Sequence, residues 1–118
     1  MFLILHARGV LPAVFALPAG AGDIAIGLTA PLVAFGFLSR SPAPKRVLIL
    51  WNVAGMLDLV VAVSLGILAS PTPAGLLARG ITTGALADFP LSLIPTFLVP
   101  FAFIAHLISI RQIRMIHR

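Results

Sequence analysis

Three long apolar stretches constrain this chain more than any other feature of its sequence. They cover residues 23–39, 47–69 and 91–110, and their only charged residues are Asp23 and Asp58. A helix of about 20 apolar residues crosses the ~30 Å hydrocarbon core of a bilayer. Charged residues make up 9% of the chain, against roughly 25% in a soluble domain, which is too few to cover a water-facing surface. We therefore expect an all-α membrane protein, a single domain built as a bundle of about three transmembrane helices.

The first 22 residues are apolar but interrupted by prolines. Pro12 and Pro18 each lack a backbone donor, so we expect a partial helix over residues 1–9 and then an irregular segment. That segment should lie at the membrane interface or against protein, because irregular backbone is not tolerated facing lipid. A cleaved secretory signal with its site at residues 19–21 is the competing interpretation, although the positively charged start of such a signal is missing.

Basic residues gather between the apolar stretches. The loop at 40–46 and the tail after 110 each carry three of them, and the loop at 70–90 carries one (Arg40, Lys45 and Arg46; Arg111, Arg114 and Arg118; Arg79). Positively charged loops stay in the cytoplasm, which predicts an outer loop at 70–90 and a cytoplasmic C-terminus. This scatter lacks the basic face that nucleic acid requires, so we expect no nucleic-acid binding.

Among the polar residues of the expected spans, Asp58 has the greatest need of a group that binds or shields its side chain, because we expect it near the bilayer midplane. A carboxylate there costs at least ~2.5–3.5 kcal/mol on insertion scales. Its spacing places it on one helical face with Trp51, Gly55, Ala62 and Gly66, and small residues let another helix approach closely. Three roles stay open: a hydrogen bond that fixes helix packing, passage of protons or ions, and contact with a partner subunit or ligand.

A matching stripe of small residues runs along the first span. It consists of Asp23, Gly27, Ala30 and Ala34, and we expect it to pack against the face that carries Asp58. Asp23 would then lie in the first turn, near the outer surface, where the helix dipole favours a carboxylate.

The third span carries a histidine at membrane depth. We expect His106 close to the cytoplasmic end, at a depth similar to that of Asn52 in the second span, so a hydrogen bond can join them. His6 should lie in the opposite half of the membrane, so the two histidines cannot ligate one haem within one chain.

Several kinds of chemistry are excluded by what the sequence lacks. The chain has no cysteine, so disulfides, thiolate metal sites and cysteine nucleophiles are ruled out. No phosphate-binding glycine loop, pair of catalytic carboxylates or Ser-His-Asp set is recognisable. We therefore expect no cofactor, no metal and no enzymatic activity.

Three motifs occur in order along the chain: LPAGAGD at 17–23, WNVAGMLD at 51–58, and LIPTFLVP at 93–100 followed by His106. Together, over residues 9–112, they resemble a group of small, uncharacterised bacterial integral membrane proteins. The resemblance implies a multi-pass protein of the bacterial cytoplasmic (inner) membrane and supplies no activity. It marks as recurring positions Gly22, Asp23, Trp51, Asn52, Asp58, Pro95, Pro100 and His106. Members of the group begin with more hydrophobic sequence before the Leu-Pro pair, whereas Met1 here falls inside what resembles a preceding helix.

The leading functional hypothesis is a non-catalytic integral membrane protein that acts as a small subunit or helix-packing partner in a membrane complex. Three helices shield a midplane carboxylate poorly from lipid. Besides the lipid bilayer, we therefore expect a homo-oligomer or a larger membrane-protein partner that covers Asp58. The alternative is a small transporter that conducts protons or a solute. Asp58 would then titrate, with Asp23 at the outer mouth and His106 at the inner mouth.

Overall fold

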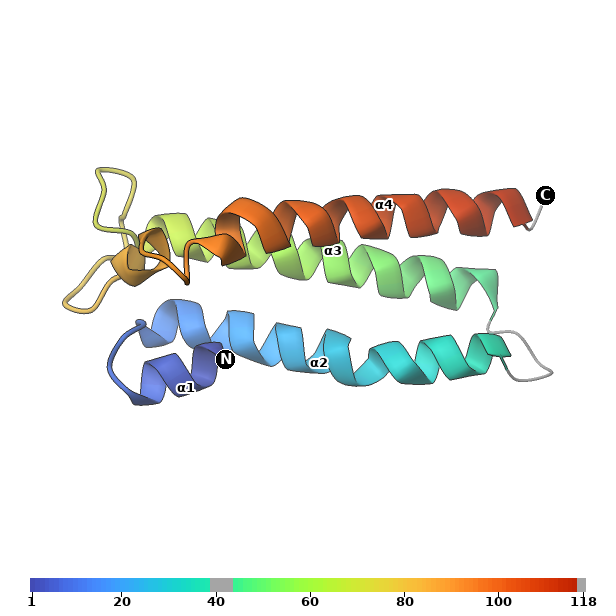
Figure 1. Cartoon of the computed structure of the whole chain (residues 1–118), viewed down its shortest axis with the longest axis horizontal. Helices are drawn as coiled ribbons and strands as arrows, with labels where there is room; N and C mark the ends of the chain where they lie inside the picture. Colours follow the sequence, from blue (N-terminus) through green and yellow to red (C-terminus); the bar gives the residue numbers. More distant parts are fainter. Residues whose placement is uncertain (39–43, 117–118) are drawn as a thin grey trace.

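The computed structural model describes residues 1–38 and 44–116 and contains no β-strand in these ranges. The described residues form the four α-helices α1 (Phe2–Ala7), α2 (Ala13–Leu38), α3 (Lys45–Leu68) and α4 (Val99–Ile116) (Figure 1). Two short segments precede α4, a 3₁₀-helix η1 (Thr83–Ala87) and a π-helix η2 (Ile94–Leu98).

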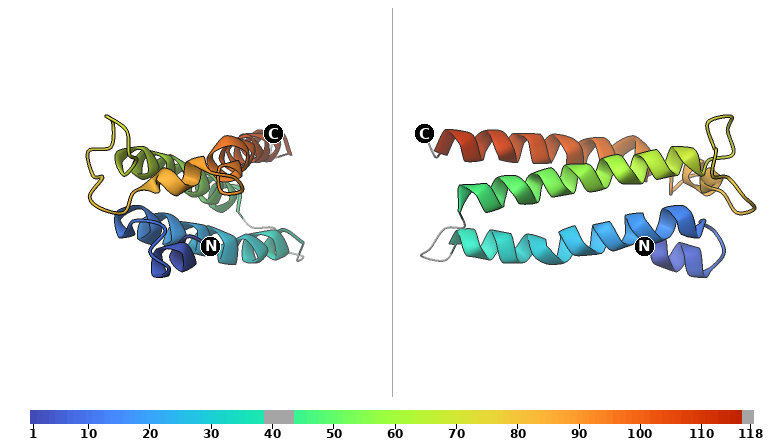
Figure 2. Two further views of the ribbon diagram at one scale, coloured as in Figure 1. Left: turned by 60° about the vertical axis from the view of Figure 1, so that its left-hand side comes forward. Right: turned by 180° about the vertical axis from the view of Figure 1, so that it is seen from behind.

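The long helices lie side by side, and α3 runs antiparallel to both of its neighbours (Figures 1 and 2). α3 packs against α2 on one side and α4 on the other, while α1 folds back along the start of α2. The end of the bundle that carries residues 70–90 is called the loop end. The opposite end carries Lys45, Arg46, Arg111 and Arg114 and is called the basic end.

Within the described residues, three stretches are long and apolar enough to span a membrane. They are Ala13–Val33, Lys45–Leu68 and Ile94–Ile116. Large apolar side chains on their outward faces are mostly exposed, including Leu28 (69%) and Phe101 (64%). A surface of this kind suits lipid and not water. The expected all-α membrane bundle is confirmed.

The predicted start of the first long helix was wrong by ten residues, because α2 begins at Ala13 and not at 23. The irregular segment is shorter than expected and joins α1 to α2, with Gly9 in a left-handed conformation (φ +70°) at its turn. The carbonyl of Pro12 accepts hydrogen bonds from the N–H groups of Phe15 and Ala16, so this proline starts a helix. Pro18 then removes one donor, and the helix continues through it, because apolar surroundings leave other backbone groups no better partners.

The end of the last span was also misplaced. Its helical run covers Ile94–Ile116 and not 91–110, so it continues through Arg111 and Arg114 of the expected tail. The second span was close, since α3 covers Lys45–Leu68 against the expected 47–69. Lys45 and Arg114 lie at the same end of the bundle (Figure 1), while Arg40 and Arg118 fall outside the described residues.

A small apolar core closes the loop end of the bundle. It consists of the buried side chains of Phe2, Leu11, Phe15, Ala16, Ala19 and Ala69. The Phe2 and Phe15 rings meet edge to face with their centroids 5.1 Å apart. Thr83 ties the 70–90 segment to the end of α3, because its hydroxyl donates to the Gly66 carbonyl (2.7 Å). At the loop end, α1, α2, α3 and the 70–90 segment are therefore packed together.

Candidate intramembrane polar site

The register between α2 and α3 decides which polar groups meet. Three side-chain contacts mark this register: Phe15 with Gly66, Gly22 with Asp58, and Thr29 with Trp51. On α2 these residues recur every seven positions, which is about two turns and gives a continuous antiparallel seam.

Asp58 lies at the middle contact of this seam. It faces Gly22 so closely that a methyl group on that glycine would overlap the Asp58 carboxylate. The absence of a side chain at Gly22 therefore makes room for the carboxylate between the helices. The neighbouring residue Asp23 brings a second carboxylate, close enough to interact electrostatically with Asp58.

Neither carboxylate has a hydrogen-bond donor or an ion pair among the described residues. The amino group of Met1 acts on Asp23 electrostatically without forming an ion pair with it. Both aspartates lie near the middle of their helices. Asp23 was expected in a first turn near the outer surface, and this placement is corrected by the earlier start of α2.

His106 forms a second polar group on the other side of α3. Its Nδ1 lies 3.0 Å from Oδ1 of Asn52, and the Asn52 amide N–H donates to the Leu48 carbonyl (2.8 Å). Because Oδ1 of Asn52 is the acceptor, Nδ1 of His106 carries the proton in this bond. In the neutral ring, Nε2 is therefore an acceptor. The hydrogen bond expected between Asn52 and His106 is present.

Gly55 provides the space that the His106 ring occupies. A Cβ atom at Gly55 would lie only 2.6 Å from both Cε1 and Nε2 of that ring. Gly55 therefore packs against α4, although the sequence placed it on the face that meets α2. His106 itself was expected near the cytoplasmic end, but Ile94–Ile116 extends well beyond it on both sides, so it lies near the middle of that stretch.

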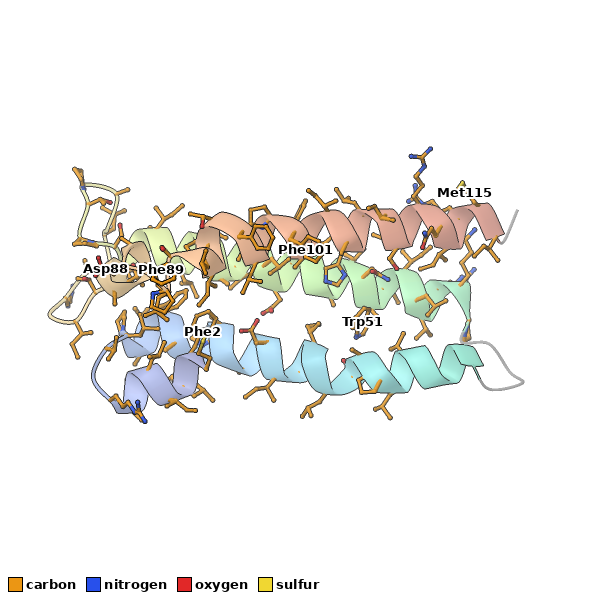
Figure 3. The ribbon with its side chains drawn as sticks, viewed as in Figure 1. Phe2, Trp51, Asp88, Phe89, Phe101 and Met115 are labelled. Carbon is orange, nitrogen blue, oxygen red and sulfur yellow. The ribbon has the colours of Figure 1, made fainter. Side chains whose placement is uncertain are left out.

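Trp51 connects the three long helices. Its indole Nε1 donates to the hydroxyl of Thr29 on α2 (2.9 Å). Its ring lies 5.6 Å, centroid to centroid, from that of His106 on α4. Figure 3 shows Trp51 reaching from α3 into the space beside α2. This bridge holds α2 and α4 against α3 on the basic-end side of the two carboxylates.

The small-residue stripe expected on α2 does not form the contact. A Cβ atom at Gly27 would meet nothing within 4 Å, so the expected packing of Gly27 against α3 is wrong. Ala30 is half-buried, and the side chain of Ala34 lies outside the described part of the structure. The contacting face instead carries Gly22 and Thr29, roughly 100° around the helix from the expected one, which is the rotation of a single residue.

A cavity of about 540 Å³ lies on the loop-end side of the carboxylates and is lined by residues of α2, α3 and α4. Asp23 is the only ionisable side chain among the described residues that line it. Ala62 and Gly66, two of the small residues expected to pack helices, also line it. Apart from these small residues, nothing in the sequence indicates the cavity, although Gly22 stands in one of the three motifs.

His6 takes no part in this site. It lies in α1, and its Nδ1 is 2.9 Å from the carbonyl oxygen of Leu11, in the connection between α1 and α2. Within the described residues, no group of three or more His, Cys, Asp or Glu side chains is arranged to hold a metal ion.

Fold and site together define an all-α membrane bundle with two neighbouring carboxylates at mid-length. The chain belongs to the family described as Domain of unknown function (DUF8737), whose model matches residues 1–114. The matched range contains every residue of the site. No curated protein and no solved structure matches the chain.

Proposed function

We propose that this chain is a non-catalytic membrane protein that conducts a proton or a small solute by way of Asp23 and Asp58. The observation that carries the proposal is the pairing of two carboxylates near the middle of adjacent helices, with no donor among the described residues. Two neighbouring negative charges repel each other in apolar surroundings, and the amino group of Met1 offsets only part of the charge on Asp23. The pair therefore favours a bound proton or another cation, which is what a transport site must take up and release.

The geometry supports transport over a purely structural role for Asp58. A carboxylate that only fixes packing accepts a hydrogen bond from the helix it faces. Asp58 instead faces Gly22, which offers no side-chain donor. Other residues already hold the bundle together, through the Trp51–Thr29 and His106–Asn52 hydrogen bonds.

Proton flux into vesicles tests this proposal. The purified protein would be reconstituted into liposomes that contain a pH-sensitive dye, and flux would be driven by a potassium diffusion potential. Asp58→Asn keeps the shape of the side chain but cannot bind or release a proton, so we expect at least a tenfold loss of flux.

Asp88→Asn is the matched control, because Asp88 lies exposed at the loop end (Figure 3). It should leave the flux unchanged. Equal flux in wild type, Asp58→Asn and Asp88→Asn would refute a role for Asp58 in proton flux, and wild-type vesicles as tight as empty ones would refute proton conduction.

A subunit role is the second candidate, supported by the exposure of Asp23. Its side chain remains exposed when only the chain's own helices are considered, and a carboxylate facing lipid is costly. A second copy of the chain or a larger membrane protein would cover it. Native mass spectrometry after gentle extraction tests this role, since a co-purified chain would support it and a bare monomer would contradict it.

We further propose that the protein lies in the bacterial inner membrane with its basic end in the cytoplasm. The basic residues at the start of α3 and the end of α4 lie at one end, as the positive-inside rule requires. Alkaline phosphatase fused after Arg79 should be active, whereas the same fusion after Arg114 should be inactive. The reverse pattern would refute this orientation.

A further inference from the structure

We propose that the cavity beside Asp23 binds a lipophilic organic cation, an amine or onium ion with an apolar body. The proposal rests on the transport role above, because it names the class of solute that the same two carboxylates take. The charged head would lie against Asp23 and Asp58, and the apolar body would fill the space toward the loop end.

The walls of the cavity fit an apolar body. They come from all three long helices, α1, η2 and the 70–90 segment, and most of the residues are aliphatic or aromatic (for example Phe2, Phe15, Leu59, Val63, Leu98 and Val99). The volume of about 540 Å³ falls within the roughly 300–1,000 Å³ that is typical of small-molecule sites. The side chains of Ser70, Thr72 and Thr83 supply the few polar groups at the loop end.

The charge of the cavity selects a cation. No lysine or arginine lines it among the described residues, and Asp23 is its only ionisable side chain there. Met1 also lines it, and its amino group offsets part of the charge of Asp23, so the net negative charge depends on both carboxylates. Asp58, facing Gly22, adds a second negative charge at the same depth. Low-dielectric walls strengthen the attraction for a positive head. An anion would be repelled, and a sugar would find too few hydrogen-bonding partners.

The ends of the cavity favour a small molecule over a transmembrane helix from a partner. A spanning helix is about 10–12 Å wide with its side chains and needs a groove that runs ~30 Å. Here the 70–90 segment lines the loop end of the cavity, and the Thr83–Gly66 hydrogen bond holds it to α3. Toward the basic end, Trp51 ties α2 to α3 and contacts His106 of α4. The space between these closures is therefore short.

Binding of tetraphenylphosphonium to the purified full-length protein in detergent tests the proposal, by equilibrium dialysis with radiolabelled ligand. We expect saturable binding with one site per chain. Asp23→Asn and Asp58→Asn should each weaken it at least tenfold, and Asp88→Asn should not change it. Triphenylphosphine oxide, an uncharged molecule of similar shape, should compete at least tenfold more weakly.

Ala102→Trp provides a second variant that keeps both carboxylates. Ala102 lines the cavity from α4, so an indole there would fill the space and should abolish binding. Unchanged binding in Ala102→Trp, or in the Asp23→Asn/Asp58→Asn double variant, would overturn the proposal, because the probe would then be held elsewhere. Far-UV circular dichroism would show that each variant remains helical.

The outcomes separate this proposal from the proposed function. Proton flux without phosphonium binding would overturn the cation site and leave transport standing. Site-dependent binding without proton flux would support the cation site and refute proton conduction. A co-purified membrane protein that must be removed before phosphonium binds would overturn the proposal in favour of a helix-covered groove, whereas site-dependent phosphonium binding in the intact complex would support it.

Discussion

Gly22→Ala is the substitution that most directly tests the seam between α2 and α3. The added methyl group would overlap the carboxylate of Asp58, so either the helices separate or Asp58 leaves its position. Overpacking of this kind typically costs about 1–3 kcal/mol. Replacing glycine by alanine within a helix returns roughly 0.5–1 kcal/mol. We therefore expect Gly22→Ala to lower the free energy of unfolding by about 1–2 kcal/mol.

Gly27→Ala is the matched control on the same helix. A Cβ atom there meets nothing within 4 Å, while the gain in helix propensity is the same as at Gly22. This variant should be neutral or more stable by up to ~1 kcal/mol. The two variants should therefore differ by about 1–3 kcal/mol, the cost of the overlap alone.

Reversible unfolding in mixed micelles measures this difference, with dodecyl sulfate as denaturant and Trp51 fluorescence as the signal. The double variant Gly22→Ala/Asp58→Ala adds a specific check, because removing the carboxylate makes room for the methyl group. Its destabilisation should be less than the sum of the single values, by about 0.5–3 kcal/mol. Equal stability of Gly22→Ala and Gly27→Ala, together with additive double-variant values, would show that Gly22 does not face Asp58.

Two further substitutions probe the remaining helix contacts. Gly55→Ala should push the His106 ring off α3, since the new Cβ would lie 2.6 Å from two ring atoms. We expect altered His106 ring ¹⁵N shifts in NMR spectra and a loss of about 1–3 kcal/mol, whereas Gly66→Ala, with its nearest neighbour at 3.5 Å, should change neither. Thr29→Val removes the acceptor of the Trp51 indole and should cost about 1–3 kcal/mol and shift the Trp51 emission, while Thr29→Ser should restore both. An unshifted emission in Thr29→Val would contradict the hydrogen bond.

The three spans could be predicted because lipid leaves the backbone few choices. A long apolar stretch must satisfy its N–H and C=O groups internally, and a helix does so. The start of α2 was predicted wrongly because the loss of backbone donors at Pro12 and Pro18 was given more weight than the need to pair the backbone groups in lipid. Pro12 supplies the first carbonyl acceptor of the helix, and Pro18 removes only one donor. Proline position alone does not distinguish these outcomes from a broken helix.

The site was predicted only in part, because depth in the membrane depends on where each helix begins. Starting α2 ten residues earlier moves Asp23 by about 15 Å along the helix axis, at 1.5 Å per residue. That shift carries it from the expected outer mouth to the level of Asp58. Extending the last helix to Ile116 likewise changes the position of His106 within it, from one turn before the expected end to the middle of the helical run. A carboxylate pair at mid-depth therefore could not be foreseen from the sequence boundaries.

The periodicity of the sequence also could not predict which face of α2 contacts α3. α2 is apolar almost all round, so no polar face indicates which side meets α3. Two stripes of small residues one position apart are then equally good, and they differ by about 100° of rotation. The Trp51–Thr29 hydrogen bond decides between them in the structure, because Thr29 lies on the Gly22 face and not on the Gly27 face.

The positions of the hydrogen bonds explain why the carboxylates stay accessible. Among the described residues, the two hydrogen bonds that join side chains of different long helices, Trp51–Thr29 and His106–Asn52, lie on the basic-end side of Asp58. On its loop-end side, α2 and α4 stand apart across α3 around the cavity. If the polar residues served only to join helices, we would expect Asp58 to accept a hydrogen bond from a side chain of α2. It faces Gly22 there instead. The bundle is thus joined by side-chain hydrogen bonds at one level and opens into a cavity at the next, where Asp23 lines the space and Asp58 lies at the same level.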